Sequence, residues 1–209
     1  MAVMGVDISG VVECRPEFGF LPDPDVAWEY AIELGQLYCG RSYDAFGCLF
    51  GVMNFAGFEP VAAERGIPAD AAEGTRRHSQ GIQPPSFSAS WISYDEIDAI
   101  DWDERAARPD ARLHQYSRGQ DGEWRMTGKA GQDRVFARHV GLSPAEAATR
   151  SWPAGSEWLI GDTLYRSEAL TRRDAIPIRS DWDPVWTVMK TLASLHGGSN
   201  VRLVVWFDR

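Results

Sequence analysis

The segment SDWDPVWTVMKTLASLHGGSNVRLVVWFDR, residues 180–209, contains the clearest structural pattern in this chain of 209 residues. Asp183 followed by Pro184 marks a helix start, because a short acidic side chain caps a helix and proline suits its first turn. Gly197 then supplies a left-handed stop. The spacing predicts a helix over 184–196. Its apolar residues recur along one face, at Val185, Val188, Met189, Leu192 and Leu195.

A strand follows the helix, over residues 201–207. Its alternate side chains are apolar on both faces, with Val201, Leu203, Val205 and Phe207 on one and Val204 and Trp206 on the other. A strand that is apolar on both faces is covered on both faces, so it lies inside a sheet and not at its edge. We therefore expect Val204 and Trp206 to be buried.

The N-terminal stretch 3–14 predicts a second strand. Its apolar positions are Val6, Ile8, Val12 and Cys14, which alternate with the polar Asp7, Ser9 and Glu13. Chain termini tend to lie close together in a domain. We therefore predict that this strand and the strand 201–207 share one sheet and pair directly, with the helix 184–196 packed across one face.

The rest of the chain mixes helices and strands without regular βαβ alternation, which is typical of the α+β class. No internal repeat or linker is found. The sequence therefore predicts a single α+β domain over 1–209, with helices packed on a central mixed or antiparallel sheet that includes both terminal strands. The other predicted elements are helices at 26–38, 43–52, 94–100 and 144–150, a hairpin of strands 112–118 and 123–129, and strands at 158–165 and 172–179.

Residues 54–90 form the least regular part of the chain. They are rich in glycine and proline, including the pair Pro84–Pro85, and they predict a long loop insertion with at most a short helical turn near Pro68. Loops of this length are uncommon inside a compact domain and are usually functional or mobile.

This loop and the tryptophan after it hold the best candidate site. Positive side chains gather there in an otherwise acidic chain, and an arginine fork binds carboxylate or phosphate well. We therefore predict an anion-binding or partner-binding site, although the same charges are also consistent with a solvated loop. The candidate site residues are Arg65, Arg76, Arg77, His78 and Trp91.

No sequence motif identifies a reaction, a metal or a cofactor. The chain lacks the common nucleotide-binding, hydrolase-elbow and zinc-binding motifs, and no two of its four histidines stand three or four residues apart. His114 and His196 are interpreted as hydrogen-bonded or helix-end residues. The carboxylates between Asp95 and Glu104 are of the type that hydrolases and hard cations use, but helix capping is the simpler explanation. The sequence thus predicts no metal site and no cofactor.

Composition narrows the partners and the compartment. The chain has 30 acidic and 21 basic residues and thus a net charge of −9. This charge disfavours nucleic-acid binding and allows a basic protein partner. It is also consistent with the ordinary surface charge that keeps a protein in solution. Neither a signal peptide nor an apolar run of membrane-spanning length is evident. Cys14, Cys39 and Cys48 lie among apolar residues and are expected to be reduced core thiols. A cytoplasmic location is predicted.

Six segments carry a resemblance to a family: GVDISGVVE (5–13), RSYDAFGCLFGV (41–52), ERGIPAD (64–70), SWISYDEI (90–97), DWD (101–103) and VRLVVWFDR (201–209). Together they resemble a family of uncharacterised small acidic proteins from bacteria and phages. The resemblance covers the two ends and the first half of the chain, and residues 118–180 lie outside it. It implies one intact domain and brings with it no activity, cofactor or catalytic residue.

Two classes of function remain open. The first is a non-enzymatic binding protein for a basic protein partner or a small anionic ligand, of the immunity, inhibitor or anti-defence type. The acidic balance, the nine tryptophans and the long loop favour it. The second is a small hydrolase or transferase that uses the arginines and histidine of residues 64–79 with nearby carboxylates. Oligomeric state is not predicted.

Overall fold

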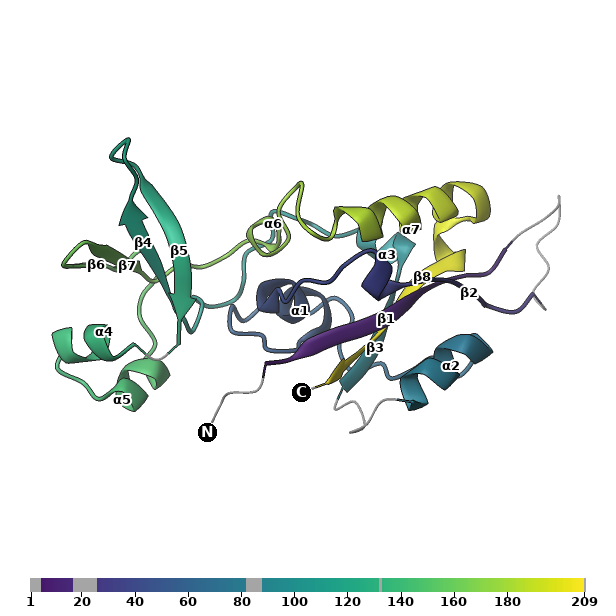
Figure 1. Cartoon of the computed structure of the whole chain (residues 1–209), viewed down its shortest axis with the longest axis horizontal. Coiled ribbons are helices and arrows are strands. Elements are labelled where there is room, and N and C mark those ends of the chain that lie inside the picture. Colours follow the sequence, from purple (N-terminus) through teal and green to yellow (C-terminus); the bar gives the residue numbers. More distant parts are fainter. Residues whose placement is uncertain (1–4, 17–25, 82–87, 132, 209) are drawn as a thin grey trace.

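Strand β8 (Val201–Asp208) lies inside a four-stranded antiparallel sheet, here called the first sheet, with the order β2-β1-β8-β3 (Figure 1). Its neighbours are β1 (Asp7–Cys14) and β3 (Ser88–Ser93), and β2 (Glu29–Glu33) forms the edge beyond β1. β1 and β8 pair along their whole lengths, from Asp7 opposite Asp208 to Cys14 opposite Val201. The prediction that both terminal strands share a sheet and pair directly is confirmed. The computed structural model describes residues 5–16, 26–81, 88–131 and 133–208.

Both faces of β8 are covered, as its sequence predicts. Val204 and Trp206 are 0% exposed. Helix α2 (Glu73–Gln80) lies over their face, where the ring of His78 is 5.4 Å from that of Trp206. The opposite face belongs to the main hydrophobic cluster, under α7 (Asp183–His196) and α1 (Tyr43–Phe50) (Figure 1). This cluster includes Val12, Phe46, Val185, Met189, Leu203, Val205 and Phe207.

Helix α7 follows the predicted bounds closely but differs at both ends. Trp182 takes the capping position without a side-chain cap, and Asp183 lies inside the first turn, where a negative charge suits the helix dipole. Gly197 ends the helix with a positive φ of +87°, which suits glycine, but its ψ of 146° lies outside the left-handed helical region that was expected of this stop. Leu195, predicted on the packing face, is 67% exposed because the helix has already run past the cluster there.

Helix α1, at the helix predicted over 43–52, is buried almost all round, and Ser42 caps it by accepting a hydrogen bond from the Ala45 N–H at 3.3 Å. Gly47 allows the chain after the helix to approach closely, because a Cβ at this position would lie 2.7 Å from the Cα of Asn54. Asn54 has little freedom to retreat, since its Oδ1 accepts hydrogen bonds from the N–H groups of Gly57 and Phe58.

We therefore expect Gly47→Ala to lower the free energy of unfolding by about 1–3 kcal/mol, because the clash with backbone outweighs the higher helix propensity of alanine. Urea denaturation measures this. Gly128→Ala is the matched control, since its Cβ would meet nothing closer than Gln115 Oε1 at 3.7 Å. A Gly47 variant as stable as that control would contradict the close approach.

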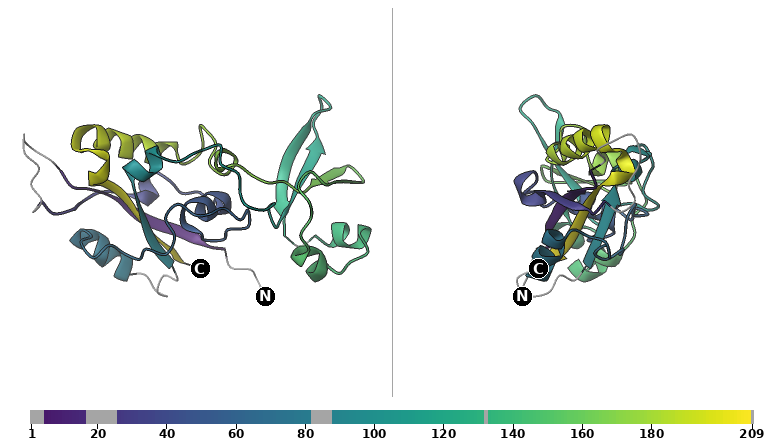
Figure 2. Two further views of the ribbon diagram at one scale, coloured as in Figure 1. Left: turned by 180° about the vertical axis from the view of Figure 1, so that it is seen from behind. Right: turned by 90° about the vertical axis from the view of Figure 1, so that its right-hand side faces the viewer.

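A second four-stranded antiparallel sheet, with the order β5-β4-β7-β6, is not anticipated by the sequence. It joins the predicted hairpin, β4 (Leu113–Arg118) and β5 (Trp124–Ala130), to β6 (Glu157–Ile160) and β7 (Thr163–Arg166). The strand predicted at 158–165 is thus two strands, which turn at Gly161 with φ at +60°. This sheet has its own hydrophobic cluster under α4 (Arg134–His139) and α5 (Pro144–Thr149), with Phe136, Trp152, Trp158 and Tyr165 (Figure 2).

Two predicted elements are wrong. The helix predicted at 26–38 is strand β2 followed by the 3-10 turn Leu34–Gln36, because pairing with β1 outweighs a moderate helical pattern. The strand predicted at 172–179 begins as helix α6 (Arg172–Ala175), because Thr171 and Asp174 form a capping box. The helices predicted at 94–100 and 144–150 are present as α3 (Tyr94–Asp98) and α5, and each begins with a capping box.

The segment 54–90 is more regular than predicted. It contains α2 and the first residues of β3, and residues 82–87 lie outside the described part of the chain. Residues 61–66 run alongside β3, and the Gly66 N–H donates to the Ala89 carbonyl at 3.0 Å.

Among the cysteines, Cys14 and Cys48 are buried, whereas Cys39 is exposed, so the expectation of three core thiols is wrong for Cys39. No helix within the described residues has the length and apolar character needed to cross a membrane.

Candidate functional site

Arg65 and Trp91, two of the predicted site residues, are in direct contact. The Arg65 guanidinium lies 4.9 Å from the Trp91 ring, and its Nη1 donates to the Trp91 carbonyl at 3.1 Å. Its Nη2 is 2.7 Å from Glu96 Oε1. Burial would raise the pKa of Glu96, but hydrogen bonds from Arg65 and Ser93 outweigh burial and lower it. The fork of Arg65 is thus bound to a carboxylate of the protein itself.

The other three predicted site residues lie on α2, on the same side of the first sheet. Arg77 forms an ion pair with Glu73 one turn earlier, and Arg76 Nη1 donates to the Ala69 carbonyl at 3.4 Å. His78 Nε2 lies 3.6 Å from a carboxylate oxygen of Glu33. Each of these side chains therefore has a partner within the protein. No contact among the described residues joins them to Arg65 in one site.

Arg202, which the sequence interpretation missed, lies beneath this surface and is 4% exposed. Its Nε donates to Glu13 Oε2 at 2.8 Å and its Nη1 to Asp70 Oδ1 at 2.9 Å. Glu13 is itself fully buried and also accepts from the Ala72 N–H at 2.8 Å. A charged residue inside the apolar run VRLVVWF, opposite another in β1, is the signal that could have revealed this pair.

Arginines and tryptophans alternate across this face in an array that we call the arginine–tryptophan ladder: Arg15, Trp28, Arg202, Trp91 and Arg65. The Arg202 guanidinium is 3.8 Å from the centre of the Trp28 ring and 5.7 Å from that of Trp91. Cations over tryptophan faces are stabilised by the ring quadrupole. The ladder joins β3 and β8 to the residues next to β1 and β2, so its arginines contribute to the fold. The carboxylate partners of Arg65 and Arg202 leave these two arginines little positive charge for an anion.

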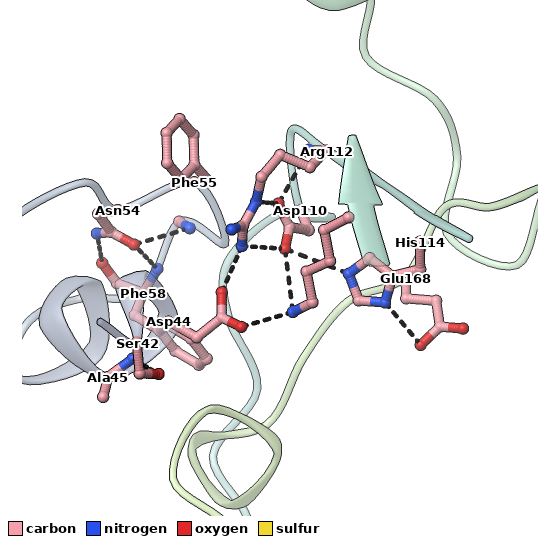
Figure 3. Close-up of polar contacts among 12 residues, drawn as sticks. Ser42, Asp44, Ala45, Asn54, Phe55, Phe58, Asp110, Arg112, His114 and Glu168 are labelled. Carbon is pink, nitrogen blue, oxygen red and sulfur yellow. Dashed lines mark hydrogen bonds and ion pairs between the residues drawn. The ribbon is translucent and has the colours of Figure 1, made fainter. Parts of the chain in front are cut away.

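A second buried group of charges joins α1 to the second sheet (Figure 3). Asp110 accepts from Arg112 Nη2 at 2.7 Å, and its Oδ2 is 3.2 Å from His114 Nε2. Arg112 also pairs with Asp44 in the first turn of α1, and Lys129 Nζ reaches the same carboxylate at 2.6 Å. We call these five residues, with Glu168, the junction network.

The junction network is built for structure more than for proton transfer. His114 is 1% exposed, and its two ring nitrogens face Asp110 and, at 3.3 Å, Glu168. Neither nitrogen is left to exchange a proton with a substrate, which a general base needs. Burial would raise the pKa of Asp110, but hydrogen bonds from His114 and Arg112 hold it well below its usual range. The expectation of a hydrogen-bonded role for His114 agrees with these contacts.

An open groove runs between α3, the segment after α6, and α7, and we call it the α3–α7 groove. It consists of two adjoining pockets, of about 310 and 190 Å³, which share Trp102, Asp183 and Trp186. The larger is also lined by Tyr94, Ile97, Asp98, Thr187 and Lys190, and the smaller by Arg173, Ile176, Pro177 and Ile178.

The walls of the α3–α7 groove are held by contacts beneath them. Trp186 stacks on the buried Trp182 with ring centroids 5.2 Å apart, and Trp182 in turn stacks on Tyr38 at 4.3 Å. The capping box of Ser93 and Glu96 sets the start of α3 and hence the position of Tyr94. Burial, and then the charge of Asp98, raise the pKa of the Tyr94 hydroxyl. These aromatic rings are therefore preorganised beside carboxylates.

The segments that line the groove carry exposed apolar and exposed acidic side chains. Ile178 is 73% exposed, the highest value among the large exposed hydrophobic residues of the described chain. Three aspartates that lie close in the sequence to lining residues are also exposed: Asp101, Asp103 and Asp181. Arg173 is engaged with Asp103 at 3.2 Å. The larger pocket of the groove thus combines aromatic faces with carboxylates.

The described residues contain no cluster of three or more histidine, cysteine, aspartate or glutamate side chains that could hold a metal ion. The resemblance noted in the sequence stays a prediction. Comparisons of the chain with protein-family models, with curated proteins and with solved structures gave no match.

Proposed function

We propose that this protein is a non-enzymatic binding protein that takes a basic segment of a partner protein in the α3–α7 groove. The observation that carries the proposal is the joining of three aromatic side chains, Tyr94, Trp102 and Trp186, with the carboxylates of Asp98 and Asp183 in one open depression. Aromatic faces and carboxylates both attract lysine and arginine.

The charge of the whole protein supports the same partner. A net charge of −9 attracts basic proteins over a distance and speeds their encounter. Tryptophan and tyrosine are also the residues most often found where a protein interface is strongest. The groove is thus supplied with both the steering charge and the anchoring side chains that such binding needs.

The other predicted functions receive less support. A small anionic ligand would need free arginine forks, but those of Arg65 and Arg77 are paired with Glu96 and Glu73. A hydrolase or transferase would need a base beside the substrate pocket, but no histidine among the described residues lines either pocket of the groove, and His78 lies over the first sheet against Trp206. We therefore favour the basic protein partner over both.

The test uses short peptides, because the partner itself is unidentified. An eight-residue peptide with two lysines and one leucine is titrated into the protein by calorimetry. Trp186→Ala is expected to weaken its binding by at least about tenfold, because central aromatic side chains of an interface commonly contribute about 2 kcal/mol.

Trp124→Ala is the matched control, because Trp124 is a half-buried tryptophan on the second sheet with its own arginine contact, to Arg118. It should leave binding unchanged. A peptide with glutamates in place of the lysines should not bind. Equal loss of affinity in the two tryptophan variants, or equal binding of the two peptides, would contradict the proposal.

A further inference from the structure

We infer that the α3–α7 groove recognises a pair of side chains, a lysine or arginine in its larger pocket and an apolar side chain in its smaller one. This inference rests on the proposed function and adds to it the kind of segment that is bound. The two pockets share Trp102, Asp183 and Trp186, so they are adjacent, and side chains close together in one peptide can fill both.

The larger pocket has the chemistry of a cation site. Tyr94, Trp102 and Trp186 supply aromatic faces, and Asp98 and Asp183 supply two carboxylates. Only one positive side chain, Lys190, lines this pocket among the described residues, and it is exposed. Two carboxylates against one ammonium group leave a net negative charge there. An incoming lysine or arginine therefore meets both ring faces and an uncompensated carboxylate.

The smaller pocket has a different character. Its lining includes Ile176, which is buried, and Pro177 and Ile178, which are exposed. The positive side chain that lines it, Arg173, donates from Nε to Asp103 Oδ1 at 3.2 Å. Apart from Arg173 and the shared Asp183, its lining is the apolar surface of the isoleucines, the proline and the tryptophan rings. Such a surface gains from covering an aliphatic side chain and offers little to a charged one.

Three peptides separate the two halves of the inference. They have the same length and hold lysine with leucine, norleucine with leucine, or lysine with serine. Norleucine keeps the aliphatic stem of lysine without the charge. With the wild-type protein, we expect each of the two altered peptides to bind about tenfold more weakly than the first, because each loses one of the two interactions.

Variants of the groove should remove one preference at a time. Asp98→Asn with Asp183→Asn is expected to reduce the preference for lysine over norleucine to about twofold while the preference for leucine over serine remains. Ile178→Ser should reduce the preference for leucine over serine while the preference for lysine over norleucine remains. Lys190→Gln should strengthen binding of the lysine peptides, because it removes the one competing charge. Asp183 also stabilises the start of α7, so Asp98→Asn alone is measured as a second variant, with thermal denaturation of each protein.

The outcomes distinguish this inference from the proposed function. If Trp186→Ala weakens all three peptides but norleucine binds as well as lysine, the groove is a binding site and the cation pocket is wrong. If serine replaces leucine without loss, the apolar pocket is wrong. If none of the peptides responds to Trp186→Ala, the proposed function itself fails. The inference holds only when the carboxylate variants and Ile178→Ser each reduce their own preference and leave the other unchanged.

Discussion

Arg202→Met is expected to lower the free energy of unfolding by about 3–5 kcal/mol, because it leaves the carboxylate of Glu13 buried without its cation. Glu13 is fully buried and Arg202 almost so, and their side chains are 2.8 Å apart. The substitution also removes the cation between Trp28 and Trp91. Guanidinium denaturation followed by tryptophan fluorescence measures the loss.

A double variant shows whether the uncompensated charge is the cause. Glu13→Met with Arg202→Met replaces the pair by apolar side chains, which is often close to neutral for a buried ion pair. It should regain more than half of the stability, although the Ala72 N–H loses its acceptor. Arg41→Met, at an exposed pair with Asp7, is the control and should change the midpoint little. If the double variant were no more stable than Arg202→Met alone, buried charge would not explain the loss.

The second large effect is expected at the junction network. Asp110→Asn should lower the free energy of unfolding at pH 7 by about 3–5 kcal/mol, because a buried carboxylate that faces Arg112 and His114 becomes neutral. The carboxylate of Asp110 has no exposed surface. Denaturant midpoints at a series of pH values measure both the loss and its pH dependence.

The pH dependence has a definite sign. The pKa of Asp110 is lower in the folded chain than its ordinary value of 3.8, so the unfolded chain binds more protons in acid. Its contribution to stability is present above about pH 4–5 and is lost as the pH falls below that range. The wild-type protein should therefore lose stability between about pH 5 and pH 2 more steeply than Asp110→Asn.

Asp121→Asn, at an exposed pair with Arg125, provides the control and should keep the wild-type slope. A slope for Asp110→Asn equal to that of the wild-type protein would show that another carboxyl carries the acid sensitivity.

The parts of the fold that were predicted correctly depend on local patterns. The helix and strand of residues 183–208 are specified by proline, glycine and apolar spacing within a few residues. β2 could not be predicted in this way, because its strand conformation comes from pairing with β1, a tertiary contact. The second sheet was missed for the same reason, since its two hairpins are joined only by the pairing of β4 with β7.

The sequence pattern indicates the carboxylates of the α3–α7 groove but not the contacts that bring them to the tryptophans. The carboxylates near Asp95 were interpreted as helix caps, and the Glu96 side chain does serve one. Asp98, three residues after Asp95, lines the groove instead, opposite Asp183 of a distant helix. Periodicity places each carboxylate on a helix, but which one meets the tryptophans depends on how α3 and α7 pack. That packing is not a local property of either segment.

The place of β8 in the first sheet has a consequence for how the chain is made. β8 lies between β1 and β3 but is the last of the four strands in the sequence. On the ribosome, β1 and β3 therefore emerge long before the strand that joins them. The edges of β1 and β3 that pair with β8 remain unpaired during this time. All strands of the second sheet emerge during that interval. Vectorial synthesis thus leaves the unpaired backbone N–H and C=O groups of β1 and β3 open to chaperones, or to the strand edges of other nascent chains, until β8 arrives.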